Sequence, residues 1–266
     1  MFEFPEWLHD YQIEDTTFGD AYEDTLPPKR AWLKKTIAQV YGINSPDAPG
    51  KTWNVNTWRG GFETEVSTEP LEWAVLLLDA KSVSPVRILA ALVPAFAAGV
   101  KSVLAVFCGE GEISRSVLAG FELAGQENVV KLPVDKVDLL LGEIIHCGID
   151  GALLDLRGEP GYVKHGPGVR YWRVPEILSI SVCREDDAPD MEVLAFAHPD
   201  VEFVEIDEDS IAESESDAVV VPAELVGDGL MNFSIVLSHG QEGCWAWNGF
   251  NSSFFKRECV ALAVAE

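Results

Sequence analysis

Apolar and polar residues alternate in blocks that divide the middle of the chain into short and long segments. Apolar runs of four to six residues predict buried strands, and longer stretches with apolar residues three and four positions apart predict helices. The predicted strands cover residues 74–78, 102–107, 129–132 and 151–156, and the predicted helices cover 84–98, 112–124 and 134–146. Strands that alternate with helices in this way predict the α/β class, with a parallel sheet covered by helices.

Proline and glycine residues mark the ends of these predicted helices. Ser84 and Pro85 are typical of a helix start, and Gly99 and Gly125 directly follow the last apolar position of their helices. Because functional loops of parallel sheets lie at the carboxyl ends of the strands, we expect a site near Asp79, Cys108 and Pro133.

The two flanking parts of the chain have weaker patterns. Residues 1–50 look like an N-terminal arm, rich in acids and aromatics, followed by a helix over 29–41 and a loop over 44–50. In the second half, short apolar runs predict strands at residues 177–182, 193–197, 218–221 and 233–237. A closing helix is predicted at 252–265. We therefore predict three parts, namely the arm and helix at 1–50, an α/β nucleotide-binding-like domain at 51–157 and an acidic α+β part at 158–266.

The charge of the chain narrows the classes of partner. Nineteen basic and 44 acidic residues give a net charge of −25, within an otherwise ordinary composition of 47% hydrophobic and 24% charged residues. Such a surface repels phosphate backbones and anionic lipids, so we expect neither a nucleic acid nor a membrane as partner. The longest apolar stretch, residues 88–100, is too short to span a bilayer. Five widely spaced cysteines and the lack of a secretory signal favour reduced thiols in the cytoplasm.

Two patterns are candidates for chemistry. Cys108, Gly109, Glu110 and Gly111 place two glycines between a strand and a helix, where backbone N–H groups are able to hold a phosphate. The alternative, which we favour, is a plain turn. Asp228 and His239 have side chains that bind zinc, but zinc sites normally use three or four protein ligands, so a turn aspartate and a hydrogen-bonded histidine are the alternative.

A short basic segment stands out in this acidic chain. His165, Arg170 and Arg173 lie close together in sequence, with Lys164 before them and Tyr171 and Trp172 among them. The cluster suggests an anion site. The alternative is a surface loop whose cations pair with neighbouring acids, and we favour that interpretation.

Several motifs resemble histidinol dehydrogenases. Residues 84–86 (Ser-Pro-Val) and 92–101 (Leu-Val-Pro-Ala-Phe-Ala-Ala-Gly-Val-Lys) resemble the first helix of that family's nucleotide-binding domain, and 117–125 resembles its next helix. Residues 222–228 (Pro-Ala-Glu-Leu-Val-Gly-Asp) and 254–257 (Phe-Phe-Lys-Arg) are similar to C-terminal motifs of the family. The resemblance implies a Rossmann-like, aldehyde-dehydrogenase-like fold in a divergent and shortened member.

The same resemblance implies cofactors and site residues. It implies NAD bound near Asp79, Ser84, Pro85, Cys108 and Gly109, and it makes Asp228 and His239 the candidate metal ligands. The family's catalytic Glu–His pair and its other zinc ligands have no counterpart here, which argues against zinc and against histidinol oxidation.

Three functions follow from these observations. The leading hypothesis is a divergent relative that keeps the scaffold without the full catalytic machinery and binds a nucleotide, a small metabolite or a protein partner. The first alternative is a working NAD-dependent oxidoreductase acting on an alcohol or aldehyde. The second alternative is an acidic interaction protein whose N-terminal arm docks on a basic partner or on a second copy, forming a homo-oligomer.

Overall fold

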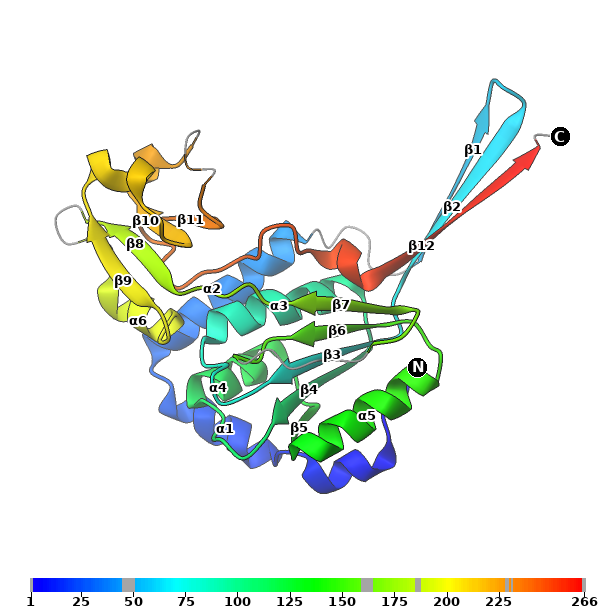
Figure 1. Ribbon diagram of the computed structural model, residues 1–266, viewed down its shortest axis with the longest axis horizontal. Coiled ribbons are helices and arrows are strands. Elements are labelled where there is room, and N and C mark those ends of the chain that lie inside the picture. The colour runs from blue at the N-terminus through cyan, green and yellow to red at the C-terminus, as the bar shows by residue number, and fades with distance from the viewer. Residues whose placement is uncertain are drawn as a thin grey trace.

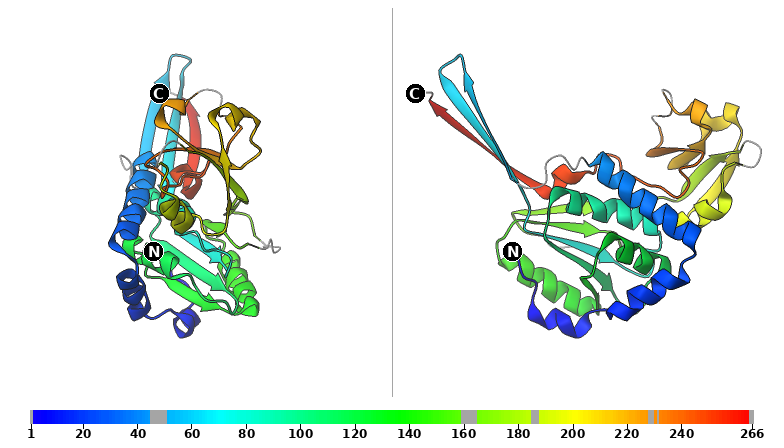
Figure 2. Two further views of the ribbon diagram at one scale, coloured as in Figure 1. Left: turned by 90° about the vertical axis from the view of Figure 1, so that its left-hand side faces the viewer. Right: turned by 180° about the vertical axis from the view of Figure 1, so that it is seen from behind.

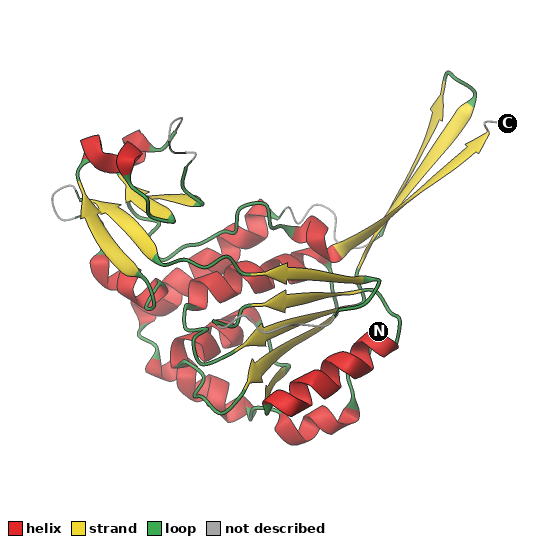
Figure 3. Ribbon diagram, viewed as in Figure 1, coloured by secondary structure: helices red, strands yellow, loops and turns green. Residues whose placement is uncertain are grey.

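Two parallel sheets and one antiparallel ribbon make up the computed structural model (Figures 1 and 3). It describes residues 2–44, 51–158, 165–184, 188–227, 230 and 232–264. A five-stranded sheet forms the centre of the body, a four-stranded sheet lies at one end, and the ribbon projects from the other end (Figure 1).

The central sheet confirms the predicted α/β class. Its strands run in the order β5-β4-β3-β6-β7, and every neighbouring pair is parallel. The bounds are β3 Trp73–Leu78, β4 Ser102–Cys108, β5 Val129–Leu132, β6 Gly151–Asp155 and β7 Val169–Arg173. The first four strands were predicted from their apolar runs, and β7 adds a fifth strand beyond residue 157.

Helices cover both faces of this sheet because β3 is apolar on both sides. Ala74, Leu76 and Leu78 lie in the core cluster shared with α3 (Pro85–Ala98) and α4 (Arg115–Ala124). Val75 and Leu77 lie in the cluster shared with α5 (Val134–His146). Strands buried on both faces read as continuous apolar runs, which is the pattern seen in the sequence.

The helix ends follow the predicted signals. The Ser84 hydroxyl accepts a hydrogen bond from the Arg87 backbone N–H at the start of α3. Gly99 ends this helix with φ at +89°, and Gly125 ends α4 with φ at +71°. Glycine adopts this left-handed conformation at little cost, so both positions stop their helices sharply.

The N-terminal residues pack on the chain's own body. A 3₁₀ helix (Glu6–Tyr11) joins the α5 side of the sheet, whereas α1 (Asp15–Asp24) and α2 (Pro27–Ile43) pack on the α3 and α4 side. Phe2 and Leu8 are buried, and the Ser102 hydroxyl donates a hydrogen bond to the Phe2 carbonyl at 2.5 Å. Two apolar residues of the predicted arm, Phe2 and Leu8, are therefore buried in the chain's own core.

The order of the strands creates a crevice between β3 and β6. The chain passes from β3 outward to β4 and β5, and then returns by way of α5 to the other side of β3. Loops that follow β3 and β6 therefore diverge at their carboxyl ends, and ligands of open α/β sheets bind at such a switch point.

The four-stranded sheet is also parallel, in the order β11-β10-β8-β9. Its strands are β8 Ser179–Cys183, β9 Glu202–Ile206, β10 Ala218–Val221 and β11 Ile235–Ser238. The predicted strand at 193–197 is wrong, because these residues belong to the helix α6 (Met191–Ala197). The Asp190 carboxylate accepts hydrogen bonds from the backbone N–H groups of Glu192 and Val193, and this N-cap starts the helix.

The predicted closing helix at 252–265 is also wrong. A short 3₁₀ turn, Ser252–Phe255, leads into the strand β12 (Lys256–Val264), which pairs antiparallel with β2 (Phe62–Pro70). With β1 (Thr52–Trp58) on the other side of β2, these strands form the ribbon, which extends away from the body (Figure 2). Within the described part of the chain, no helix combines the length and the apolar character needed to cross a bilayer.

Candidate ligand cavity at the carboxyl ends of β3, β6 and β7

A cavity of about 660 Å³ opens at the switch point of the central sheet. Its lining comes from the loop after β3 and the first turn of α3, from the segment after β6, and from the segment after β7. Asp200, which lies between α6 and β9, adds a residue from the part of the chain that carries the four-stranded sheet. This volume lies within the range of about 300–1,000 Å³ that is typical of small-molecule and cofactor sites.

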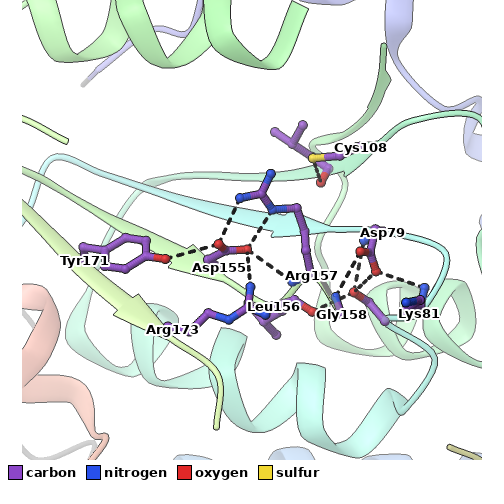
Figure 4. Close-up of polar contacts among 11 residues, drawn as sticks. Asp79, Lys81, Cys108, Asp155, Leu156, Arg157, Gly158, Tyr171 and Arg173 are labelled. Carbon is purple, nitrogen blue, oxygen red and sulfur yellow. Dashed lines mark hydrogen bonds and ion pairs between the residues drawn. The ribbon is translucent and has the colours of Figure 1, made fainter. Parts of the chain in front are cut away.

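Asp155 organises the charges beside this cavity (Figure 4). Its side chain is fully buried at the end of β6, and its Oδ1 accepts a hydrogen bond from Arg157 Nε at 2.8 Å. Arg173 Nη1 lies 3.1 Å from the same oxygen, and the Tyr171 hydroxyl donates to Oδ2 at 3.2 Å. Burial by itself raises the pKa of Asp155, but the hydrogen bonds and charges of Arg157 and Arg173 outweigh it and lower that pKa.

Two guanidinium groups therefore share one carboxylate. The Asp155 charge balances only one of Arg157 and Arg173, and both arginines line the cavity. The side chains of Arg157 and Arg173 keep 17% and 29% of their surface exposed, so their charges reach the cavity. This cluster gives the cavity a positive wall.

Arg87 adds a third guanidinium group from the first turn of α3. It forms an ion pair with Asp200 and is largely buried, with 10% of its side-chain surface exposed. Burial lowers the pKa of Arg87 while Asp200 opposes this shift. Its Nε is buried and has no hydrogen-bond partner among the described residues.

The predicted residue Asp79 ties two of the lining loops together. Its Oδ1 accepts from the Lys81 backbone N–H at 2.9 Å, and its Oδ2 accepts from the Gly158 backbone N–H at 3.0 Å (Figure 4). Asp79 therefore fixes the loop after β3 against the loop after β6. Direct contact of Asp79 with a cofactor stays a prediction.

Ser84, another predicted residue, lines the cavity, and Pro85 follows it as the first residue of α3. The Ser84 hydroxyl donates to the Ala197 carbonyl at 2.6 Å and accepts from the Arg87 N–H, while Pro85 has no N–H. The first turn of α3 thus offers few free backbone donors. A phosphate here has to be held mainly by side chains.

Cys108 and Gly109 lie at the end of β4, outside the cavity lining of the described residues. Burial raises the pKa of the Cys108 thiol to about 12, so the thiol is neutral and unreactive. The Gly109 N–H donates to the Leu132 carbonyl at 2.8 Å. A Cβ at Gly111 would lie 2.4 Å from Ala80 Cβ, so close packing of two loops explains this second glycine. Cofactor binding by Cys108 and Gly109 stays a prediction.

The candidate metal pair of Asp228 and His239 stays a prediction, because the structure describes only one of the two residues. His239 follows β11, and its Nε2 lies 3.0 Å from the Cys183 carbonyl oxygen. Asp228 lies outside the described residues. In the segments that the structure describes, no group of three or more His, Cys, Asp or Glu residues is placed to hold a metal ion.

The two arginines of the short basic segment, Arg170 and Arg173, lie on opposite faces of β7. Neighbouring residues of β7 point to opposite faces, so Arg173 reaches Asp155 whereas Arg170 donates to the carbonyls of Ser253 and Phe254. The His165 ring stacks on Tyr171 at a centroid distance of 5.1 Å. Sequence reasoning noticed Arg173 but missed Arg87 and Arg157, although their places in a first helical turn and just after a strand were usable signals.

Comparisons with known proteins support the fold. No protein-family model matches the chain, and no curated protein is significantly similar to it in sequence. Among solved structures it is similar to histidinol dehydrogenase from Elizabethkingia anophelis, with 12% identity and a TM-score of 0.57 over 96% of this chain and 77% of that one. Succinate-semialdehyde dehydrogenase from Burkholderia pseudomallei has 8% identity and a TM-score of 0.46, over 90% of this chain and 77% of that one. The first similarity confirms the dehydrogenase-like fold.

Proposed function

We propose that the protein binds an anionic nucleotide of the NAD class in the cavity at the carboxyl ends of β3, β6 and β7. The observation that carries this proposal is the charge of the cavity lining, which has four cationic residues (Lys81, Arg87, Arg157, Arg173) and two acidic ones (Glu176, Asp200), within a chain whose net charge is −25. In so acidic a protein, a positive wall attracts a negatively charged ligand and repels a positively charged one.

The residues fit the parts of a dinucleotide. Guanidinium groups bind phosphate oxygens through paired N–H donors, and Arg157, Arg173 and Arg87 supply such groups from three sides of the cavity. Apolar side chains for the base and sugar line the same space, namely Val83, Ile88, Leu156, Val174 and Ile177. NAD, when bound, supplies the capacity to accept or donate a hydride.

The lining favours binding over oxidation of an alcohol. Such a reaction needs a proton acceptor within hydrogen-bond reach of the reacting hydroxyl. Among the described residues that line the cavity there is no histidine, cysteine or tyrosine. Of its two carboxylates, Asp200 is paired with Arg87 and Glu176 is exposed to solvent. The proposal is therefore a nucleotide-binding protein on a dehydrogenase-like scaffold.

Isothermal titration calorimetry with NAD, NADH and ADP tests this function. We expect saturable binding of at least one of the three, and a loss of affinity of about tenfold or more in Arg173→Gln, since charged hydrogen bonds contribute about 1.5–3 kcal/mol. Arg184→Gln is the matched control, because it removes an arginine that pairs with Glu205 away from the cavity lining. Equal affinities in both variants, or no heat with any of the three at millimolar concentration, would overturn the proposal.

The oxidoreductase alternative is tested in the same samples. Protein mixed with NAD and a panel of alcohols and aldehydes is followed by the absorbance of reduced nicotinamide. We expect no turnover above that of Arg173→Gln. Turnover that Arg173→Gln abolishes would replace the binding proposal by the enzyme alternative.

A further inference from the structure

Asp200 brings a negative charge to the wall of the ligand cavity. It reaches the cavity from the turn between α6 and β9, whereas its ion-pair partner Arg87 lies in the first turn of α3. The Asp200 side chain keeps 35% of its surface exposed and that of Arg87 keeps 10%, so the carboxylate is the more accessible member of the pair. An anionic ligand in the cavity therefore meets the Asp200 carboxylate as well as the arginines.

The contact between these two parts of the fold does not depend on the Asp200 charge. The Ser84 hydroxyl donates a hydrogen bond to the Ala197 carbonyl at 2.6 Å, and the Trp247 indole N–H donates to the Arg87 carbonyl at 3.0 Å. Both hydrogen bonds hold the first turn of α3 in place, and neither uses a charged group. An ion pair with a partly exposed partner adds little to stability. An effect of the Asp200 charge on a ligand is therefore separable from an effect on the fold.

The charges around the cavity nearly cancel among the described residues. The ion pairs there join three guanidinium groups and two carboxylates, namely those of Arg87, Arg157 and Arg173 and those of Asp155 and Asp200. The other two charged residues of the lining have opposite signs. The described surroundings of the cavity therefore have a surplus of one positive charge, and loss of the Asp200 charge would double that surplus.

Nucleotides that share an adenosine diphosphate part differ in net charge. NAD has two phosphate charges and one positive nicotinamide ring, and NADH lacks the positive charge. ADP ends in a phosphate that takes a second negative charge near neutral pH. The negative charge therefore increases from NAD through NADH to ADP. A like charge in a binding site disfavours the more highly charged ligand.

We propose that Asp200 makes the cavity selective for nucleotides of low net charge, such as NAD, over nucleoside polyphosphates, such as ADP. This selectivity rests on the nucleotide binding proposed above and names the class of nucleotide that fits. Arginines alone would attract any polyphosphate, and more strongly with each phosphate charge. Because the Asp200 carboxylate lowers the positive surplus, each further negative charge on a ligand gains less binding energy.

Isothermal titration calorimetry of Asp200→Asn with NAD, NADH and ADP tests the selectivity. Asparagine keeps the size of the side chain and an oxygen that accepts from Arg87, and it removes the charge. We expect affinity to rise by about threefold for each net negative charge of the ligand, so that the gain is smallest for NAD and largest for ADP.

Glu202→Gln is the matched control for this experiment. It removes the same charge from an exposed residue at the start of β9 that does not belong to the cavity lining. Because water and salt screen this distant carboxylate, we expect changes below about twofold with all three nucleotides.

Salt and a second variant separate charge from shape. Sodium chloride screens charges, so the ratio of ADP affinities between Asp200→Asn and the intact chain should shrink severalfold from about 0.05 to 0.5 M salt. Asp200→Ala removes the accepting oxygen together with the charge, and we expect the same order of gains among the three nucleotides. Circular dichroism checks that all variants fold.

Two results would overturn the selectivity while nucleotide binding stands. Equal gains for NAD, NADH and ADP in Asp200→Asn would indicate a loosened cavity rather than a charge effect. A loss of affinity in Asp200→Asn would indicate that the carboxylate accepts hydrogen bonds from the ligand.

Inorganic pyrophosphate distinguishes failure of the selectivity from failure of nucleotide binding, since it has the charge without base or sugar. Tighter binding of pyrophosphate by Asp200→Asn than by the intact chain, with no binding of any nucleotide, would support the charge effect and remove the nucleotide. No binding of pyrophosphate or of any nucleotide, by the intact chain or by Asp200→Asn, would overturn both proposals.

Discussion

The Asp155 carboxylate and the Arg157 guanidinium meet in a two-pronged ion pair, with Oδ1 at 2.8 Å from Nε and Oδ2 at 2.9 Å from Nη2. The pair joins the end of β6 to the loop that follows it. Because Asp155 is fully buried and Arg173 shares it, this one carboxylate supports the positive wall of the cavity.

Asp155→Asn removes the negative charge with which both Arg157 and Arg173 form ion pairs. We expect the free energy of unfolding to fall by about 3 kcal/mol, because a partly buried guanidinium pair is left without its counter-charge. Urea denaturation measures this change. Asp138→Asn, which removes an exposed carboxylate from α5, is the control, and its effect should stay within about 0.5 kcal/mol. Equal effects of the two substitutions would contradict a structural role for the Asp155 cluster.

Gly151→Ala tests the packing at the start of β6. A Cβ at this position would lie 2.0 Å from Cε2 of Trp73, its register partner on β3, so the strands or the indole have to move. We expect a loss of about 1–3 kcal/mol in the free energy of unfolding. Gly142→Ala is the control within α5, where nothing lies within 4 Å of an added Cβ. There alanine should stabilise the protein by about 0.5–1 kcal/mol, and thermal unfolding distinguishes the two signs.

His198 makes stability depend on pH in a defined window. Burial, followed by the positive charge of Arg87, lowers the pKa of this fully buried imidazole from 6.5 to about 3. Between these values the unfolded chain binds the proton and the folded chain does not, so stability falls as the pH drops below about 6.5. The slope approaches about 1.4 kcal/mol per pH unit for one such group.

The contribution of His198 is separated from that of the carboxylates by substitution. His198→Gln should have a shallower dependence of unfolding free energy on pH between about 6 and 4 than the intact chain. Urea denaturation over this range gives both slopes. Identical slopes would show that His198 is already protonated, or accessible to protons, in the folded protein.

The five cysteines should differ in reactivity with iodoacetamide. Burial raises the pKa of Cys108 to about 12 and also raises the pKa of the buried Cys244, so both thiols stay protonated at pH 8. Cys147 and Cys259 are exposed and should be alkylated first. Peptide mass spectrometry before and after unfolding in urea measures the order. Early modification of Cys108 would indicate a thiolate at the end of β4.

The central sheet was predictable because its signals are local. Strands buried on both faces require continuous apolar runs, and Ser84, Gly99 and Gly125 mark helix ends through interactions within a few residues. The segment Val193–Ala197 was misassigned because a short apolar run fits a strand or a helix equally well, and only the Asp190 cap decides between them.

The ribbon and the cavity were not predictable, because they depend on contacts between residues that are distant in the sequence. The ribbon pairs Phe62–Pro70 with Lys256–Val264, and no local pattern shows that pairing. The cavity likewise gathers Arg87 from a helix start, Arg157 from a loop and Arg173 from a strand end. The sequence marked Ser84 as a helix start, which is a local signal, but it had no means of showing which carboxylate the arginines share.

The pairing of β2 with β12 has a consequence during synthesis of the chain. β2 ends at Pro70, and its partner strand begins only at Lys256. At translation rates of about 5–20 residues per second, the hairpin of β1 and β2 waits roughly ten to forty seconds for its third strand. During that interval an unpaired strand edge faces the crowded surroundings of the ribosome, where chaperones that bind extended segments would find a ready substrate.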